Sequence, residues 1–195
     1  MLPQEFSQPV LLGTSNSGKV VEISCFARRF GFSVVGLKDP GLAGAGPLPR
    51  VAEVALSYEG NARIKGLAYS KWSGRPCLTD DTGLEVPMLF DLPGIYTAPW
   101  GPRRVQEALG IHRVVPARFV CCMVYTEASG RTVSATGVVE GELRNLFVNQ
   151  SSHPLPFSKF FFPYGATESL SELVAGGYEG SHRYRALKAL VLALS

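Results

Sequence analysis

Residues 53–84 read EVALSYEGNARIKGLAYSKWSGRPCLTDDTGL, a helical pattern followed by a short apolar strand. This order is typical of an α/β fold. A helix is predicted over 52–72, and its expected buried side consists of Leu56, Ala62, Ile64, Leu67, Ala68 and Trp72. The strand over 75–79 is then expected to end at Asp80 and Asp81.

The two consecutive aspartates, followed by Thr82 and Gly83, have two interpretations. At a strand end, such carboxylates can meet a divalent metal and a phosphorylated substrate, because Mg²⁺ takes carboxylate and phosphate oxygens. Asp-Asp-x-Gly is also ordinary turn chemistry, since Asp caps turns and Gly tolerates positive φ. Taken alone, the four residues favour a turn.

Strands and helices alternate along the rest of the chain. In chain order, the expected elements are a strand at 10–13, a helix at 20–31, a strand at 118–125, a turn at 127–130, a hairpin partner at 132–139, a β segment around 160–162 and a helix at 181–194. One antiparallel patch among alternating strands and helices implies an α/β protein with a mixed sheet flanked by helices. The length of 195 residues fits a single domain over 1–195.

A polar loop separates the first strand from the first helix. It reads Thr14, Ser15, Asn16, Ser17, Gly18, Lys19. Backbone N–H groups at a helix start attract anions, and Lys19 adds a full positive charge. The loop is suited to a polyphosphate, although the spacing differs from a Walker A loop. Alternatively, Asn or Ser simply caps the helix and Lys19 lies in solvent.

Composition excludes several classes of protein. A hydrophobic content of 46% with 18% charged residues indicates a compact protein, and no apolar run reaches the roughly 18 residues that span a bilayer. The first ten residues carry no secretory pattern, so a cytoplasmic location without membrane attachment is expected. A net charge of +3 without a basic, aromatic stripe argues against nucleic-acid binding. The four cysteines are too few and too badly spaced for a zinc motif or a disulfide framework.

Seven motifs in order resemble the inosine/xanthosine triphosphate pyrophosphatase family over most of the chain. They are T-x-N-x-G-K-x-x-E at 14–22, E-x-x-x-S-Y-x-x-N-A-x-x-K at 53–65, DDTGLEV at 80–86, PGIYTA at 93–98, ARFVC at 117–121, G-x-x-E-G at 137–141 and S-H-R-x-x-A-L at 181–187. The resemblance implies an elongated mixed sheet with two lobes and a central cleft. It also implies a Mg²⁺-dependent homodimer that hydrolyses ITP, dITP and XTP to the monophosphate and pyrophosphate.

The resemblance also implies roles for individual residues. The implied catalytic residues are Asp81, the base for the attacking water, with Lys19 and Asp80, and the implied metal ligands are Glu53 and Asp81. The implied substrate-binding residues are Thr14, Ser15, Asn16, Ser17, Gly18, Lys19, Lys65, Thr82, Phe157, Ser158, His182 and Arg183. His182 and Arg183 match the pair that contacts the base. As an isolated pair they would be interpreted as solvated residues at a helix start.

The chain departs from the family pattern around the base. Residues 154–159 read PLPFSK where the family has Gly-Phe-Gly-Tyr-Asp-Pro, so prolines replace glycines and Ser158 replaces a carboxylate. Gly177 stands in place of a basic residue, and Pro99 replaces an arginine. Lys159 could substitute for a lost cation or lie on the surface. The segment 100–116 is short for the long helix of the family.

The sequence therefore predicts a metal-dependent nucleoside triphosphate pyrophosphatase with a rebuilt base site. A site that loses hydrogen-bonding groups for a base edge loses discrimination, so the preferred base stays open. Two alternatives also stay open. One is a catalytically weak nucleotide-binding or regulatory protein, and the other is a related enzyme for modified pyrimidine triphosphates, which the motifs at 80–86 and 181–187 fit less well.

Overall fold

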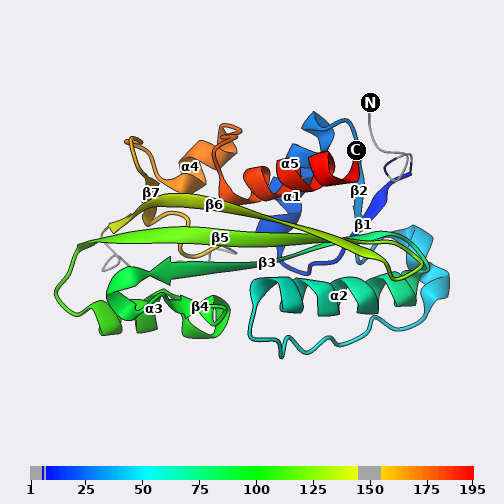
Figure 1. The fold of residues 1–195 in the computed structure, drawn as a ribbon, viewed down its shortest axis with the longest axis horizontal. Helices are drawn as coiled ribbons and strands as arrows, with labels where there is room; N and C mark the ends of the chain where they lie inside the picture. Colours follow the sequence, from blue (N-terminus) through cyan, green and yellow to red (C-terminus); the bar gives the residue numbers. More distant parts are fainter. Residues whose placement is uncertain (1–5, 7, 145–154) are drawn as a thin grey trace.

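One mixed β-sheet runs the length of the elongated molecule (Figure 1). The computed structural model describes residue 6, residues 8–144 and residues 155–195. In this part of the chain the strands lie in the order β2-β1-β3-β5-β6-β7, and β4 pairs with β3 off this path. The elements are β1 (Val10–Leu12), α1 (Ser17–Arg29), β2 (Val34–Gly36), η2 (Pro40–Ala45), α2 (Tyr58–Ser73), β3 (Cys77–Val86), η3 (Pro87–Leu89), β4 (Leu92–Gly94), α3 (Thr97–Leu109), β5 (Val114–Thr126), β6 (Thr132–Arg144), β7 (Phe161–Pro163), α4 (Leu170–Ala175) and α5 (His182–Leu194).

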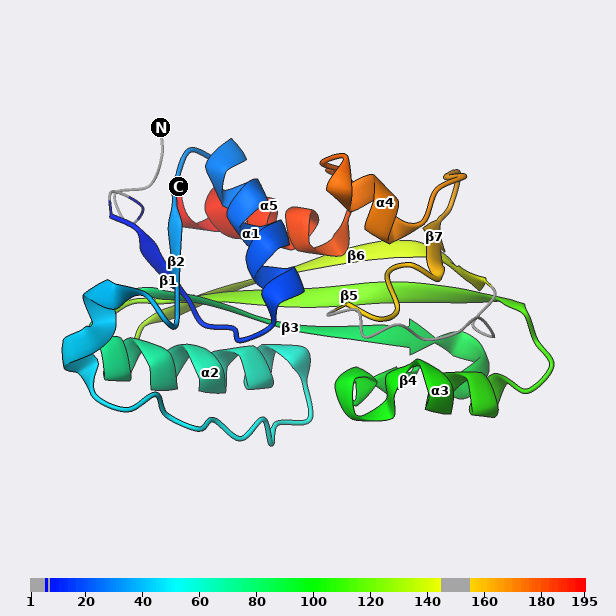
Figure 2. The same ribbon diagram turned by 180° about the vertical axis from the view of Figure 1, so that it is seen from behind.

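Helices cover both faces of this sheet (Figures 1 and 2). Helices α1, α4 and α5 lie on one face, and α2 and α3 lie on the other. Strands β1, β2 and β3 are parallel where they pair, whereas β3, β5, β6 and β7 pair antiparallel. The predicted mixed sheet flanked by helices is therefore confirmed.

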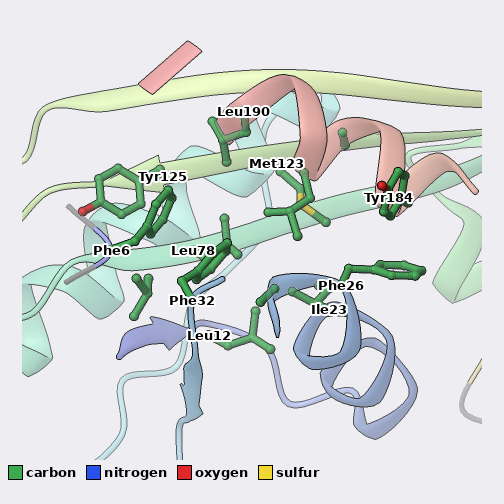
Figure 3. Packing of buried hydrophobic residues seen from close by; sticks show 14 of the residues in the cluster. Phe6, Leu12, Ile23, Phe26, Phe32, Leu78, Met123, Tyr125, Tyr184 and Leu190 are labelled. Carbon is green, nitrogen blue, oxygen red and sulfur yellow. The ribbon is translucent and has the colours of Figure 1, made fainter. Parts of the chain in front are cut away.

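Two apolar clusters make up much of the core, one beside α1 and α5 and the other with residues from both α3 and α4. The first joins β1, α1, β5 and α5 and includes Leu12, Phe26, Leu78 and Met123 (Figure 3). The second lies toward β7 and α4 and includes Leu84. Because Leu78 and Leu84 belong to different clusters, the polar residues between them on β3 lie at the boundary of the two clusters.

Strand β3 is longer than the sequence suggested. It continues through Asp80 and Asp81 to Val86, so the predicted strand end and the turn interpretation are both wrong. The physical reason is the antiparallel pairing with β5, which runs without interruption from Cys77 to Glu85. Thr79 further fixes the strand, because its hydroxyl donates to the Ala62 carbonyl of α2 over 2.7 Å.

Helix α2 begins later than predicted. Residues 52–56 are not helical, and Ser57 is the N-cap whose hydroxyl accepts the Gly60 N–H over 3.0 Å. Ala62 is fully buried as expected, but Leu56 is 86% exposed and Leu67 is 42% exposed, so their predicted burial is wrong. Because Leu56 precedes the helix, its helical spacing does not place it on the buried side.

Helix α3 was not predicted from the sequence. It contains Pro99, Gly101 and Pro102, residues that normally interrupt helices. The structure accommodates them with a kink at Gly101, whose φ is 64°. The C-terminal helix, by contrast, starts at His182 behind the N-cap Ser181, as expected.

Gly137 on β6 allows the first turn of α5 to lie directly against the sheet. A Cβ at this position would collide with the His182 carbonyl oxygen and the Ala186 amide nitrogen. We expect Gly137→Ala to lower the free energy of unfolding by about 2 kcal/mol or more, because strand and helix must separate. Urea denaturation followed by circular dichroism measures the change.

Gly36→Ala is the matched control, because a Cβ added at this position would have only its chain neighbours within 4 Å. The control is expected to stay within about 0.5 kcal/mol of the parent protein. Equal losses in both variants would contradict the close approach of α5 and β6.

Candidate active site

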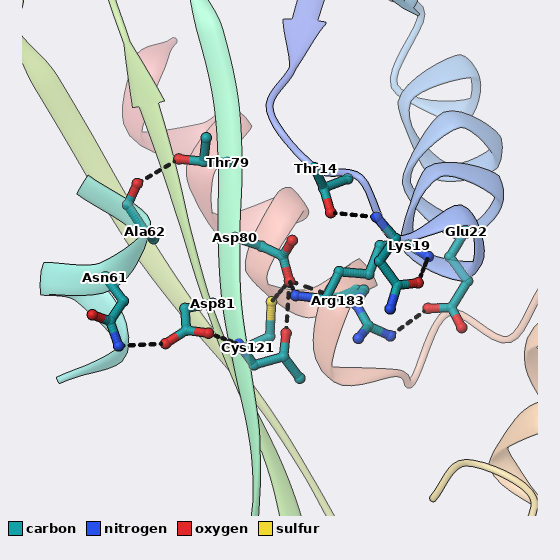
Figure 4. A network of polar contacts seen from close by, with 12 residues as sticks. Thr14, Lys19, Glu22, Asn61, Ala62, Thr79, Asp80, Asp81, Cys121 and Arg183 are labelled. Atoms are coloured by element: carbon teal, nitrogen blue, oxygen red, sulfur yellow. Dashed lines mark hydrogen bonds and ion pairs between the residues drawn. The ribbon is translucent and has the colours of Figure 1, made fainter. Parts of the chain in front are cut away.

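The middle of β3 has an edge that no other described strand covers. On that side, β1 pairs only with Cys77 and Leu78, and β4 pairs only from Leu84 onward. We call the uncovered stretch, residues 79–83, the notch. Because successive side chains of a strand point to opposite faces, the Asp80 and Asp81 side chains lie on opposite faces of the sheet at the notch (Figure 4).

On the face covered by α1 and α5, Asp80 is buried among cations. Lys19 Nζ lies 2.7 Å from Asp80 Oδ2, and Arg183 Nε lies 3.8 Å from the same oxygen. The Thr82 hydroxyl donates to it over 2.7 Å. Burial alone would raise the pKa of Asp80, but Lys19 and Arg183 outweigh this effect and hold the pKa well below its ordinary value. Asp80 is therefore an anion that fixes two cations at the notch.

The polar loop before α1 positions Lys19. Asn16 is the N-cap, and its side-chain oxygen accepts the Lys19 N–H over 3.1 Å. Thr14 Oγ1 accepts the Asn16 N–H over 3.2 Å. The helix thus begins at Ser17, three residues before the predicted start, and Ser15 and Ser17 are exposed. The capping interpretation is right for Asn16, which caps the helix. It is wrong for Lys19, which pairs with Asp80 instead of lying in solvent.

Arg183 and His182 are buried at the start of α5. Arg183 Nη1 lies 2.8 Å from Glu22 Oε2 on α1. The His182 ring stacks on Phe119 with a centroid distance of 4.8 Å, and neither ring nitrogen has a hydrogen-bond partner among the described residues. Burial and the nearby Arg183 hold the pKa of His182 well below its ordinary value, so the ring is neutral at pH 7. The interpretation of the pair as solvated is wrong.

On the opposite face, Asp81 belongs to a second polar group with α2. Asn61 Nδ2 donates to Asp81 Oδ2 over 3.1 Å, and Lys65 Nζ lies 2.7 Å from Glu53 Oε2. Burial raises the pKa of Asp81, and Lys65 and Lys19 offset this increase only in part. For Lys65, burial acts to lower the pKa, but Asp80, Asp81 and Glu53 raise it overall, so the side chain stays charged.

The two predicted metal ligands, Glu53 and Asp81, both belong to the polar group beside α2. They do not form a complete metal site by themselves. Among the described residues, no group of three His, Cys, Asp or Glu side chains could hold an ion. Mg²⁺ usually needs only one or two carboxylates, because water and substrate phosphates complete its octahedron. Asn61 bonds Asp81 and the Ala55 backbone near Glu53, so Glu53 and Asp81 fit a Mg²⁺ whose remaining positions water or substrate phosphates fill.

Two pockets flank the notch and share Ala98 in their walls. One, of about 260 Å³, is lined by Lys19, Thr82, Phe119, Phe157 and Arg183, among others. The other, of about 420 Å³, is lined by Glu53, Asn61 and Tyr96, among others. Of the predicted substrate-binding residues, Asn16, Lys19, Thr82, Phe157, Ser158 and Arg183 line the first pocket. Ser17 and Gly18 instead line a third pocket with Val21 and Cys25.

The diverged loop borders the first pocket. Phe157 and Ser158 are buried and line it, and the Phe157 ring also packs into the second apolar cluster. Lys159 does not line this pocket, and its ammonium lies 5.0 Å from the centroid of the Phe160 ring. Pro154 lies outside the described residues. Gly177 has a φ of 86°, and its carbonyl accepts a hydrogen bond from Arg29 over 2.8 Å.

Sequence reasoning missed three side chains at this site. Glu22 and Asn61 are within quoted motifs, at spacings that place them one turn from Lys19 and Lys65, but they received no role. Thr97 begins α3, and its hydroxyl accepts the Leu84 N–H over 2.8 Å at the end of the notch. Thr97 also lies in a quoted motif, at 93–98, but it received no role.

The molecule is an α/β protein with a mixed sheet and with ion-paired groups on both faces of its central strand. The sequence model described as the Ham1 family matches residues 10–193, so this chain belongs to the Ham1 family.

Relatives with known names agree with this membership. The chain is 33% identical over 193 residues to a protein of Deinococcus radiodurans named dITP/XTP pyrophosphatase, with 94% of this chain and 92% of that protein covered. It is 29% identical to one of the same name from Exiguobacterium sibiricum, with 95% and 96% covered. A solved HAM1 protein from Coxiella burnetii has the same fold, with a TM-score of 0.73, 23% identity and 95% and 98% coverage.

Proposed function

We propose that this protein hydrolyses nucleoside triphosphates with non-standard purine bases, such as ITP, dITP and XTP, to the monophosphate and pyrophosphate. Relatives that align over nearly the whole chain are named dITP/XTP pyrophosphatases. The observation in this molecule that carries the proposal is the notch, where Lys19 with Asp80 on one face adjoins Asp81 with Lys65 on the other. Cations and carboxylates so arranged suit the cleavage of a phosphoanhydride.

The proposed reaction is a single displacement at the α-phosphorus. A water oxygen bonds to this phosphorus, the bond to the α–β bridging oxygen breaks, and pyrophosphate leaves. Asp81 takes the proton of the water, and its raised pKa makes it a stronger base than an exposed aspartate. Lys19 and Lys65 offset the charge of the phosphates, and Ser15, Ser17 and Gly18 provide N–H groups around the start of α1.

In this proposal Glu53 and Asp81 hold Mg²⁺. When bound, the ion would neutralise phosphate charge and orient the substrate. Asp80 does not take part in this binding, because its carboxylate faces Lys19 and Arg183 on the other side of β3. The two aspartates therefore have separate roles: Asp80 keeps the cations in place, and Asp81 contacts the reacting groups.

The base is proposed to lie in the pocket lined by Phe119, Phe157, Ser158 and Arg183, beside the buried His182. Ser158 offers a hydroxyl, which can donate or accept a hydrogen bond, where relatives with the family pattern have a carboxylate. A rotating hydroxyl distinguishes a 6-oxo from a 6-amino purine poorly. We therefore expect modest discrimination among purine triphosphates.

A homodimer is proposed from the family resemblance alone, and the cytoplasmic location expected from the sequence stays a proposal. Within the described part of the chain, no helix has the length and apolar composition to cross a bilayer. Gel filtration with light scattering at several protein concentrations would measure the oligomeric state.

A substrate panel tests the activity. We expect Mg²⁺-dependent release of pyrophosphate from ITP, dITP and XTP, with dUTP and the four standard triphosphates as comparisons, measured by anion-exchange chromatography of the products. Release of orthophosphate instead would indicate a different bond cleavage. No turnover of any substrate would contradict the enzyme proposal, and a nucleotide-induced rise in Tm without product would identify a binding protein.

A further inference from the structure

One side chain on α2 touches both parts of the proposed metal site. Asn61 is only 4% exposed, and its Nδ2 donates to Asp81 Oδ2 over 3.1 Å. Its Oδ1 accepts the backbone N–H of Ala55 over 2.9 Å. Ala55 lies two residues after Glu53, so the Asn61 amide connects the segment of one proposed ligand to the carboxylate of the other.

The segment that carries Glu53 has few other attachments. Residues 46–56 form neither helix nor strand, and most of their side chains are exposed. Trp72 Nε1 donates to the Gly46 carbonyl at one end over 3.2 Å. At the other end, among the described residues, the polar contacts of residues 52–56 are the Ala55–Asn61 hydrogen bond and the Glu53–Lys65 ion pair. Asn61 therefore controls where the Glu53 backbone lies relative to β3.

The chemistry of both partners fixes the orientation of the amide. A carboxylate only accepts hydrogen bonds and a backbone N–H only donates them, so the amide nitrogen must face Asp81 and the oxygen must face Ala55. Aspartate at this position would put a second carboxylate against Asp81. Leucine has a similar shape but would leave the Ala55 N–H without this partner. An amide of this length satisfies both contacts at once.

We propose that Asn61 is a positioning residue that sets the separation of Glu53 and Asp81, so that both carboxylates reach one divalent cation. This inference rests on the proposed function, in which these two residues hold the metal. In this proposal Asn61 acts through Asp81 and the Ala55 backbone. Residues that orient metal ligands typically change metal affinity about 10- to 100-fold when they are removed.

Metal binding by the intact protein tests the proposal without relying on turnover. Mn²⁺ alone is titrated into the protein, and free Mn²⁺ is measured by electron paramagnetic resonance. We expect Asn61→Ala to raise the Mn²⁺ Kd by about 10-fold or more. The Mg²⁺ concentration for half-maximal ITP hydrolysis should rise in parallel, whereas KM for ITP at saturating Mg²⁺ should stay within about twofold, because Asn61 acts on the cation site only.

Ser70→Ala is the matched control. Ser70 is also buried on α2, and its hydroxyl donates to the Glu127 carbonyl over 2.9 Å, away from the notch. It should leave the Mn²⁺ Kd unchanged. Asn61→Ser provides the same comparison as Asn61→Ala if the alanine variant does not fold.

The outcomes separate this inference from the proposed function. If Glu53→Gln and Asp81→Asn lose Mn²⁺ binding while Asn61→Ala binds like the parent protein, the metal site stands and the role of Asn61 is refuted. If Glu53→Gln and Asp81→Asn also bind Mn²⁺ normally, the metal ligands of the proposed function are wrong. A parent protein that does not bind Mn²⁺ would overturn the inference, because two carboxylates held at the right separation should bind the ion with water in the remaining positions.

Discussion

Replacing Asp81 with asparagine is expected to lower the rate of pyrophosphate release by about 10³-fold or more. The variant loses both the proposed base and one carboxylate of the proposed metal site, and removal of a general base alone typically costs 10²- to 10⁴-fold. The shape of the side chain is retained, and Asn61 Nδ2 can still donate to an oxygen at this position. Initial rates with ITP at saturating Mg²⁺ measure the loss.

The same substitution should leave the fold intact. Burial raises the pKa of Asp81, which means that the folded protein favours the neutral form of this group relative to an exposed aspartate. A neutral amide therefore removes an unfavourable buried charge, and we expect Tm to stay the same or rise. Asp91→Asn is the control, because its carboxylate is about half exposed and pairs only loosely with Arg118 at 3.7 Å. More than about a tenth of the parent rate in Asp81→Asn would refute the assignment of Asp81 as base.

The antiparallel part of the fold was predictable, whereas the central strand was only partly so. Strand β5 follows an apolar run, β6 follows as its partner after a clear turn, and α5 follows its apolar periodicity. The sequence around Asp80, in contrast, carries turn residues, and pairing with β5 keeps it extended. Pairing between strands about 40 residues apart is a tertiary effect that local propensity does not contain.

The site was predictable as a set of residues but not as an arrangement. The motifs named Lys19, Asp80 and Asp81, and the structure brings these residues to one notch. Their division between two faces follows only once β3 is known to continue, because a turn would allow both carboxylates to face the same way. Glu22 is 161 residues from its partner Arg183, so nothing local in the sequence indicates their ion pair.

Truncation of Glu22 tests whether this buried ion pair supports the fold as well as the site. Arg183 and Glu22 are 3% and 10% exposed in their side chains, and their charged atoms are 2.8 Å apart. Removing one partner of a buried pair leaves the other charge buried without a counter-ion, which typically destabilises a protein by about 3–5 kcal/mol. We expect Glu22→Ala to lower the free energy of unfolding by about 3 kcal/mol, near the lower limit, because Asp80 at 3.8 Å still balances part of the Arg183 charge.

Glu179→Ala is the matched control for this comparison. Its ion pair with Arg29 has a similar length, 3.1 Å, but the Arg29 and Glu179 side chains are 39% and 60% exposed. Exposed pairs contribute roughly 0–1 kcal/mol, because water already solvates both charges and the Coulomb attraction is weak. Urea denaturation of both variants measures the difference, and a loss below about 1 kcal/mol in Glu22→Ala would mean that Arg183 finds enough compensation from Asp80 alone. In that case Asp80, rather than Glu22, would be the residue that holds Arg183 at the pocket.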